Sequence, residues 1–183
     1  MTTDTHTDTQ KTTLPDGPAV YVGTYGKYAR GSIGGRWVDL EDFAGDREAF
    51  LEHCAEIHAD EREPEFMFQD FQGFPREFYG ESGLPESLFD WLEADENDRE
   101  LWARYMDATG DSGVTLDDAQ DHYSGTYSSG AEFAEQIAED CGEIPKDVPS
   151  WIVIDWEASW ERGLRFDYCT SEGDNGETWF FHN

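Results

Sequence analysis

The chain has 183 residues, and its 42 acidic against 12 basic side chains give a formal net charge of −30. Self-repulsion at this level opposes a compact state, and high net charge with low hydrophobicity is the usual signature of disorder. Aromatic residues make up 15% of the chain and recur from Tyr21 to Phe181, which excludes a wholly disordered acidic chain and favours a folded protein with a charged surface.

The N-terminal part predicts a flexible tail followed by a small α+β lobe. Residues 1–18 are polar, lack periodicity and end in Pro, Asp and Gly. From Ala19 the stretch AVYVGTY is typical of a β-strand, and RWVDL after a glycine-rich loop is its expected hairpin partner. An apolar stripe predicts an amphipathic helix from Asp46, and the alternating residues 65–71 predict a further strand.

The middle of the chain predicts four helices. Pro85 is placed at the first position of one helix, and a second is expected from residue 98 to 109. The third opens at Thr115, with Asp118 three residues later in capping-box spacing. The fourth is expected over residues 131–141, where apolar and acidic side chains point to different faces.

The C-terminal part returns to strands. Residues 151–155, 164–169 and 178–182 each have strand composition, with a charged connection through Trp156 and Trp160. The expected fold class is therefore α+β, with mixed antiparallel sheets at both ends and a helical central region.

The cysteines and the hydropathy pattern indicate a cytoplasmic protein. Cys54, Cys141 and Cys169 are odd in number and widely spaced, so a disulfide framework is not expected. No run approaches the roughly 20 apolar residues that cross a bilayer, and the N-terminus has no apolar signal core. We therefore expect no membrane contact.

The sequence motifs for phosphate and metal binding are incomplete in this chain. Near Lys27 the chain resembles a phosphate-binding loop, but Tyr21 stands in place of the leading glycine and Tyr28 in place of the Ser/Thr. An EF-hand spacing from Asp107 to Asp118 has its glycine one place late, at Gly113. His53 and His58 are five residues apart, which a helix does not bring together, so structural histidines are the better interpretation.

We accordingly expect a protein that is not an enzyme, with no catalytic residue, no cofactor and no metal. The enzyme alternative is a glycosidase with a carboxylate pair and exposed tryptophans. Among 42 acids some pair always looks suitable, so that signal has little specificity.

The charge itself allows three explanations: an unselective solvated surface, adaptation to high salt, and imitation of a polyanion. Residues 81–147 hold 19 acids against Arg99, Arg104 and Lys146, and salt adaptation does not require such clustering. Three lysines beside nine arginines nevertheless suit a halophile or a GC-rich genome. A salt-adapted acidic scaffold with another basic partner therefore stays open as an alternative.

Helix geometry sets what a mimic of DNA requires. Duplex DNA carries about one charge per 1.7 Å of axis, whereas acids at i, i+4 and i+7 on a helix give roughly one per 5 Å. About three acidic elements side by side are needed to approach the duplex. The central region offers the row 86/90/93, the cluster 95–121 and the row 132/135/139.

Two long stretches carry a family resemblance. AVYVGTYGKYARGSIGGRWVDL at 19–40 and EFMFQDFQGFP at 65–75, together with LWARYMDATGD, resemble the ArdA family of antirestriction proteins. The resemblance implies a non-enzymatic, usually homodimeric DNA mimic that mobile DNA carries and that occupies the DNA-binding groove of type I restriction-modification enzymes, without binding nucleic acid. By this resemblance, the family's antirestriction motif corresponds to residues 102–113, for which folding, dimerisation and binding all stay open as roles.

The resemblance also implies an elongated chain of three small lobes. We expect a tail at 1–18, an N-terminal α+β lobe at 19–75, a central helical lobe at 76–112, and a C-terminal α+β lobe at 113–183 as the possible dimerisation region. The acids nominated for contact with the partner are Glu86, Asp90, Glu93, Asp95, Glu96, Asp98, Glu100, Asp107, Asp111, Asp117, Asp118, Asp121, Glu132, Glu135, Glu139 and Asp140.

Overall fold

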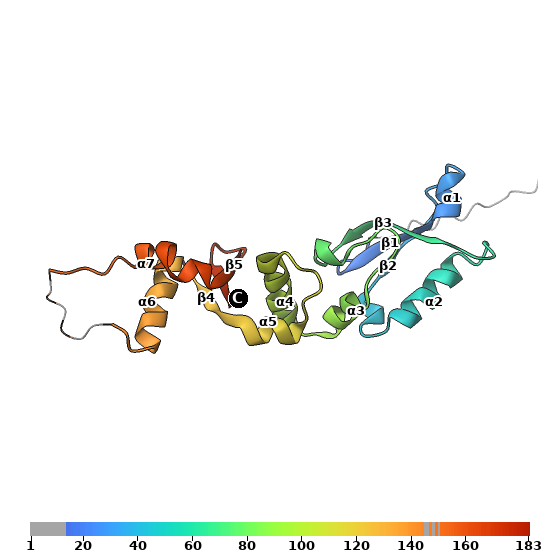
Figure 1. The fold of residues 1–183 in the computed structure, drawn as a ribbon. Helices are drawn as coiled ribbons and strands as arrows, with labels where there is room; N and C mark the ends of the chain where they lie inside the picture. Colours follow the sequence, from blue (N-terminus) through green and yellow to red (C-terminus); the bar gives the residue numbers. More distant parts are fainter. Residues whose placement is uncertain (1–13, 145–146, 148, 150) are drawn as a thin grey trace, which may run out of the picture. The chain divides into compact units, whose positions relative to one another are not determined.

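A computed structural model describes residues 14–144, 147, 149 and 151–183 (Figure 1). Over these residues it has seven α-helices and two three-stranded antiparallel sheets, which confirms the α+β class. The chain divides into two compact units, one ending at Ala94 and the other running from Asp95 to Asn183. The boundary falls inside the predicted central lobe 76–112, whose separate existence stays a prediction. Most of the predicted tail, residues 1–13, lies outside the described residues.

The sheet of the first unit has the strand order β2-β1-β3. Its strands are β1 (Ala19–Thr24), β2 (Arg36–Asp39) and β3 (Phe66–Gln72). The predicted hairpin is confirmed, because β1 and β2 pair antiparallel with Tyr21 opposite Trp37. A short helix that the sequence did not predict, α1 (Tyr25–Ala29), leaves the end of β1, where the Thr24 side chain accepts a hydrogen bond from the Lys27 backbone N–H.

Helix packing on one face of this sheet forms the first core. A 3₁₀ turn at Glu41–Phe43 precedes helix α2 (Arg47–Ile57), which the Asp46 side chain caps. A second 3₁₀ turn at Arg76–Phe78 precedes helix α3 (Glu86–Glu93). Phe50 on α2 is fully buried and lies 5.8 Å from the Phe68 ring of β3 and 5.4 Å from the Phe89 ring of α3. Pro85 is the residue that precedes α3 rather than its first helical residue, a shift of one position from the prediction.

The sheet of the second unit has the order β4-β6-β5. Its strands are β4 (Tyr123–Tyr127), β5 (Tyr168–Glu172) and β6 (Thr178–His182). The strand predicted at 178–182 is confirmed, whereas that at 164–169 is a 3₁₀ turn, Leu164–Phe166, followed by the start of β5. The strand predicted at 151–155 is wrong, because its described residues are neither helix nor strand and β4 pairs with β6 instead.

Both faces of the second sheet are covered by helices (Figure 1). Neighbouring residues of a strand point to opposite faces. Phe181 lies 5.0 Å from the Tyr105 ring of α4 (Glu96–Thr109), in a cluster that includes Ala119 of α5 (Leu116–His122). Phe180 stacks 4.2 Å from Phe133 of α6 (Gly130–Asp140) and packs against Trp160 of α7 (Trp156–Arg162). The second unit is therefore a sheet between two helical layers.

The three helices predicted in this unit are confirmed, and each bound that was predicted lies within two residues of the observed one. Helix α4 ends at Thr109, and Gly110 after it has the left-handed φ of 68° typical of glycine at such ends. The capping box between Thr115 and Asp118 is present at the start of α5. Helix α7 was missed, because the stretch around Trp156 and Trp160 was interpreted as a connection; Asp155 caps its first turn. No helix of the described residues has the length and apolar character of a membrane span.

Truncation of Phe180 tests the two-sided packing. Phe180→Ala is expected to lower the free energy of unfolding by about 3–5 kcal/mol, because the site cannot collapse around a lost aromatic ring. Thr170→Ala, at the exposed residue opposite Phe180 on β5, is the control and is expected to stay within about 0.5 kcal/mol. Denaturant unfolding measures both, and equal effects would contradict the packing.

Candidate functional site: the exposed carboxylates

In the first unit, the acids of α3 lie on its solvent side. Glu86, Asp90 and Glu93 are exposed, whereas the residues between them form the buried face of the helix. This is the row that the sequence nominated. Their carboxylates have no hydrogen bond or ion pair with another described residue.

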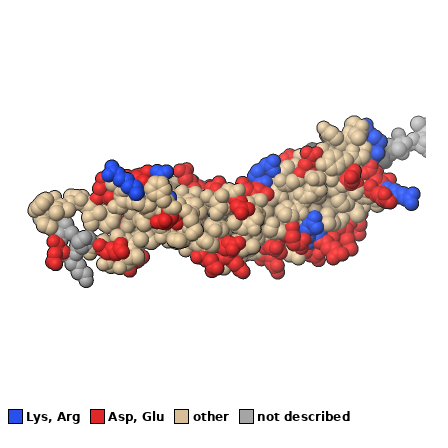
Figure 2. All heavy atoms as spheres, in the orientation of Figure 1, with Lys and Arg blue, Asp and Glu red and all other residues tan. Residues whose placement is uncertain are grey.

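A second acidic row on α2 was missed by the sequence analysis. Glu48, Glu52 and Glu56 are exposed and follow each other at four-residue spacing, so their positions are about 6 Å apart along the helix. The repeated four-residue spacing of the acids is a readable signal in the sequence, beside the apolar stripe from which the helix itself is predicted. Figure 2 shows acidic side chains gathered over α2 and α3. The candidate surface of the first unit is therefore larger than predicted.

In the second unit, the nominated acids come from α4, α5, α6 and the residues that flank them. All of them are exposed except Asp98, which is half-buried. Figure 2 shows acidic side chains over α4 and α5. The carboxylates of five have no hydrogen bond or ion pair with another described residue: Glu96, Asp117, Asp121, Glu135 and Glu139.

Other nominated acids of this unit are partly used by the fold itself. Asp95 caps α4 through the N–H groups of residues 97 and 98. Asp107 accepts a hydrogen bond of 2.7 Å from the buried Ser171 hydroxyl, and Glu100 pairs with Arg104 at 3.4 Å. Partners from within the unit also bind the side chains of Asp98, Asp111, Asp118, Glu132 and Asp140.

Local hydrogen bonds shift the pKa of two of these carboxyls. The side-chain hydroxyl and then the backbone N–H of Thr115 lower the pKa of Asp118. The hydroxyl and then the backbone N–H of Ser128 lower the pKa of Glu132 in the same way. Both side chains therefore stabilise helix N-termini, where negative charge is favoured.

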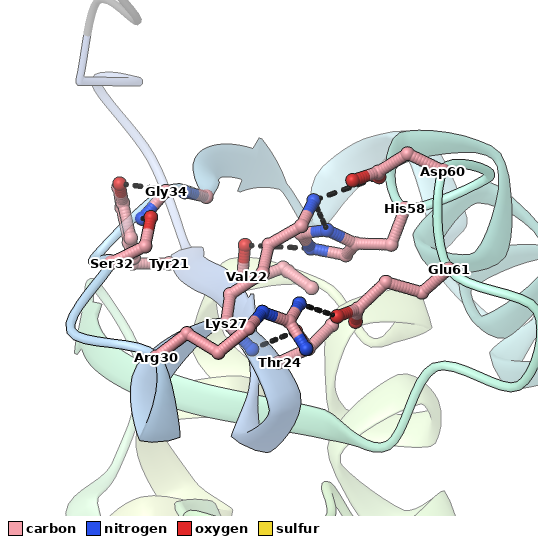
Figure 3. A network of polar contacts seen from close by, with 11 residues as sticks. Tyr21, Val22, Thr24, Lys27, Arg30, Ser32, Gly34, His58, Asp60 and Glu61 are labelled. Carbon is pink, nitrogen blue, oxygen red and sulfur yellow. Dashed lines mark hydrogen bonds and ion pairs between the residues drawn. The ribbon is translucent and has the colours of Figure 1, made fainter.

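A polar network ties α1 to the residues after α2 (Figure 3). The Lys27 ammonium lies 2.8 Å from Asp60 Oδ1 and 3.0 Å from His58 Nδ1, and Arg30 pairs with Glu61. His58 is buried, and its Nε2 lies 3.2 Å from the Val22 carbonyl oxygen. A neutral ring that donates from Nε2 and accepts at Nδ1 satisfies both contacts.

This network gives His58 a structural role. Burial lowers the pKa of His58, and Lys27 adds to that effect, while the Val22 carbonyl and the carboxylates of Asp60 and Glu61 act in the opposite direction. His53 instead contacts the Phe43 ring and lies 3.8 Å from Glu56. Within the described part of the chain, no three His, Cys, Asp or Glu side chains are grouped as a metal site.

Together these features define a small acidic α+β protein whose candidate site is a set of separate exposed carboxylates rather than a single cleft. A family model described as antirestriction protein (ArdA) matches residues 20–176. The chain therefore belongs to the ArdA family of antirestriction proteins, as the sequence resemblance predicted. The family implies an antirestriction function directed at a restriction-modification enzyme. Comparison with curated proteins gave no match, and comparison with solved structures gave none.

Neutralising Asp118 is expected to destabilise the second unit in a pH-dependent way. Because the folded-state pKa of Asp118 is lowered, its contribution is fully present above the ordinary carboxyl pKa of about 3.9 and is lost as pH falls through the lower folded value. Asp118→Asn should therefore unfold at lower denaturant at pH 7, with the difference shrinking below pH 4. Asp117→Asn, its unpaired neighbour, is the control. A difference that persists unchanged at acid pH would exclude the carboxylate as its source.

His58 is expected to make the first unit less stable in mild acid. Since its pKa is lowered on folding, the unfolded state takes up a proton first, so stability falls as pH drops below the ordinary histidine pKa of about 6.5. The loss between pH 7.5 and 5.5, measured by denaturant unfolding, should shrink in His58→Gln. The half-exposed His53 is the control: His53→Gln should keep the loss seen in the parent protein, and a loss that is equal in all three proteins would contradict this role.

Proposed function

We propose that the protein is a DNA mimic that inhibits a type I restriction-modification enzyme by occupying its DNA-binding groove. The observation that carries the proposal is the presence of exposed helical carboxylates without partners among the described residues, namely Glu86, Asp90 and Glu93 with Glu48 and Glu52 in the first unit. Glu56 extends the α2 row and lies 3.8 Å from His53 Nδ1. Inhibition of this kind needs no catalytic residue, and family membership supports the antirestriction part of the proposal.

The amount of charge in each unit supports mimicry. The first unit has 20 acidic and 7 basic residues, and the second has 22 and 5. One helical row is too sparse for duplex DNA, which carries about one charge per 1.7 Å, but the rows of α2 and α3 supply two within one unit. The α2 row therefore raises the charge that the first unit can present.

The chemistry of the carboxylates suits a groove lined with Lys and Arg. Carboxylate oxygens accept charge-assisted hydrogen bonds from these side chains, as phosphate oxygens do. An acid that has no partner in the free protein breaks no internal ion pair when it binds. Association of such surfaces is steered by their opposite fields, so it should be fast and should weaken as salt rises.

We also propose that the protein acts in the cytoplasm as a homodimer formed through the C-terminal residues 113–183. Large apolar side chains are exposed there: Trp151 by 79%, Val153 by 87% and Phe166 by 71%. Apolar side chains of α6, α7 and the intervening chain also line an open hollow of about 410 Å³. Apolar surface of this kind marks protein interaction sites more often than it is left in water.

The decisive experiment is competition for DNA binding by a purified type I restriction-modification enzyme. The protein should displace DNA at near-stoichiometric concentration, less well at higher salt, and should not bind DNA itself. Failure to compete at any salt would overturn the proposal. Stability that rises steeply in molar salt would then favour the salt-adapted alternative.

A triple variant tests the α2 row. Glu48→Gln, Glu52→Gln and Glu56→Gln together should weaken competition roughly 3- to 100-fold, since exposed ion pairs contribute about 0.2–1 kcal/mol each. The control triple Glu63→Gln, Glu65→Gln and Glu77→Gln removes the same charge from exposed positions outside the helical rows. Equal weakening by both triples would show that only net charge matters.

A further inference from the structure

An open hollow of about 390 Å³ lies on the sheet of the first unit, on the face opposite α2. Residues paired across antiparallel strands share a face, and Tyr21 is paired with Trp37 on one side and with Asp70 on the other. The next pair, Val22 and Phe68, points the other way, and Phe68 contacts Phe50 of α2. All three strands therefore contribute to the hollow, which Ile33 and Gln69 complete.

Two aromatic rings form walls nearly at right angles. The Tyr21 and Trp37 rings are 5.7 Å apart with an interplanar angle of 76°. Ile33, 75% exposed, adds an apolar side from the glycine-rich loop. The Tyr21 hydroxyl fixes this loop, because it donates to the Ile33 carbonyl oxygen at 2.9 Å and accepts from the Gly35 N–H at 3.1 Å.

Gly35 allows the loop to return this close to the strand. A Cβ at this position would lie 2.2 Å from the Val22 carbonyl oxygen, which no side chain tolerates. Figure 3 shows Tyr21 beside Ser32 and Gly34 of the same loop. The hollow is therefore held open by the fold rather than formed by a flexible segment.

Two polar side chains of the hollow, Asp70 and Gln69, offer acceptor oxygens. The exposed Asp70 carboxylate accepts the Phe71 N–H at 2.9 Å, and no Lys or Arg among the described residues pairs with it. Gln69 uses its amide N–H₂ in a long 3.8 Å contact to the Met67 sulfur, which leaves its carbonyl oxygen to accept. Two aromatic rings, an apolar wall and a carboxylate together favour a cation.

Elsewhere in the first unit, an arginine of the chain itself already stacks on two aromatic rings. The Arg76 guanidinium lies over the rings of Tyr79 and Phe71, at 4.8 and 5.6 Å from their centroids. Phe71 directly follows Asp70 in the chain. The Tyr21 and Trp37 rings, by contrast, have no such cation from the described residues.

We propose that this hollow binds an arginine side chain of the inhibited enzyme, an inference that rests on the proposed function. A guanidinium is planar and weakly hydrated, so it can stack on an aromatic ring while it donates two hydrogen bonds to one carboxylate. A lysine ammonium lacks that fork and is more strongly hydrated. One arginine held against the two rings and the carboxylate would then anchor an interface whose other contacts are individually weak.

The first test uses the competition assay with the whole enzyme. Asp70→Asn keeps the shape of the side chain and the acceptor for the Phe71 N–H, and it should weaken competition roughly tenfold or more. Asp90→Asn, a single change in the α3 row, should weaken it less than about threefold. Equal effects of the two variants would overturn the proposal that the hollow binds an arginine. Failure of the parent protein to compete would instead overturn the proposed function.

The second test needs no enzyme. A Gly-Arg-Gly peptide and its uncharged citrulline counterpart are titrated into the full chain while the Trp37 indole N–H signal is followed by NMR. The arginine peptide should shift that signal, the citrulline peptide should not, and Asp70→Asn should abolish the response. Equal shifts with both peptides, or no shift with arginine at tens of millimolar, would overturn the site.

Discussion

Mutual repulsion among the carboxylates is the constraint that the rest of the structure has to satisfy. A charge of −30 on 183 residues opposes any compact state, so burial within each unit must offset it. Both cores meet this demand with aromatic rings, which bury more area per residue than aliphatic side chains do. Phe50 contacts Phe68 and Phe89 in the first unit, and Phe180 contacts Phe133 and Trp160 in the second. The aromatic content of the chain is thus the counterpart of its charge.

The fold sorts its acids into two groups. Acids at helix starts, such as Asp46, Asp95 and Asp155, accept backbone N–H groups that have no partner within the helix and sit where the helix dipole favours negative charge. Acids in the middle of helices, such as Glu52 and Asp90, have no such use and project into solvent. The second group is costly to the isolated protein and is therefore the part of the surface whose charge calls for a function.

The sequence predicted those features that depend on short-range patterns. The capping box of Thr115 and the row of α3 follow from spacing along one helix. Features that depend on distant pairing were not predictable: residues 151–155 have strand composition but no strand to pair with, and β4 is defined only by its partner β6. In the same way, the sequence nominates Asp107 as an acid free to contact the partner. Its hydrogen-bond donor, Ser171, lies 64 positions away in the chain, so spacing along the chain could not reveal that contact.

Distributed charge and a shaped pocket solve different parts of recognition. A set of exposed carboxylates attracts any cationic groove and tolerates changes in its details, but each contact is weak and screened by salt. Such a surface gives a fast encounter without fixing how the two molecules align. A preformed pocket with aromatic walls, such as that of Tyr21 and Trp37, accepts one side chain in one place. Since its contacts are short-ranged, salt should weaken them less than it weakens the contacts of the carboxylate rows. The pocket would then still align the two proteins at salt concentrations that screen their long-range attraction.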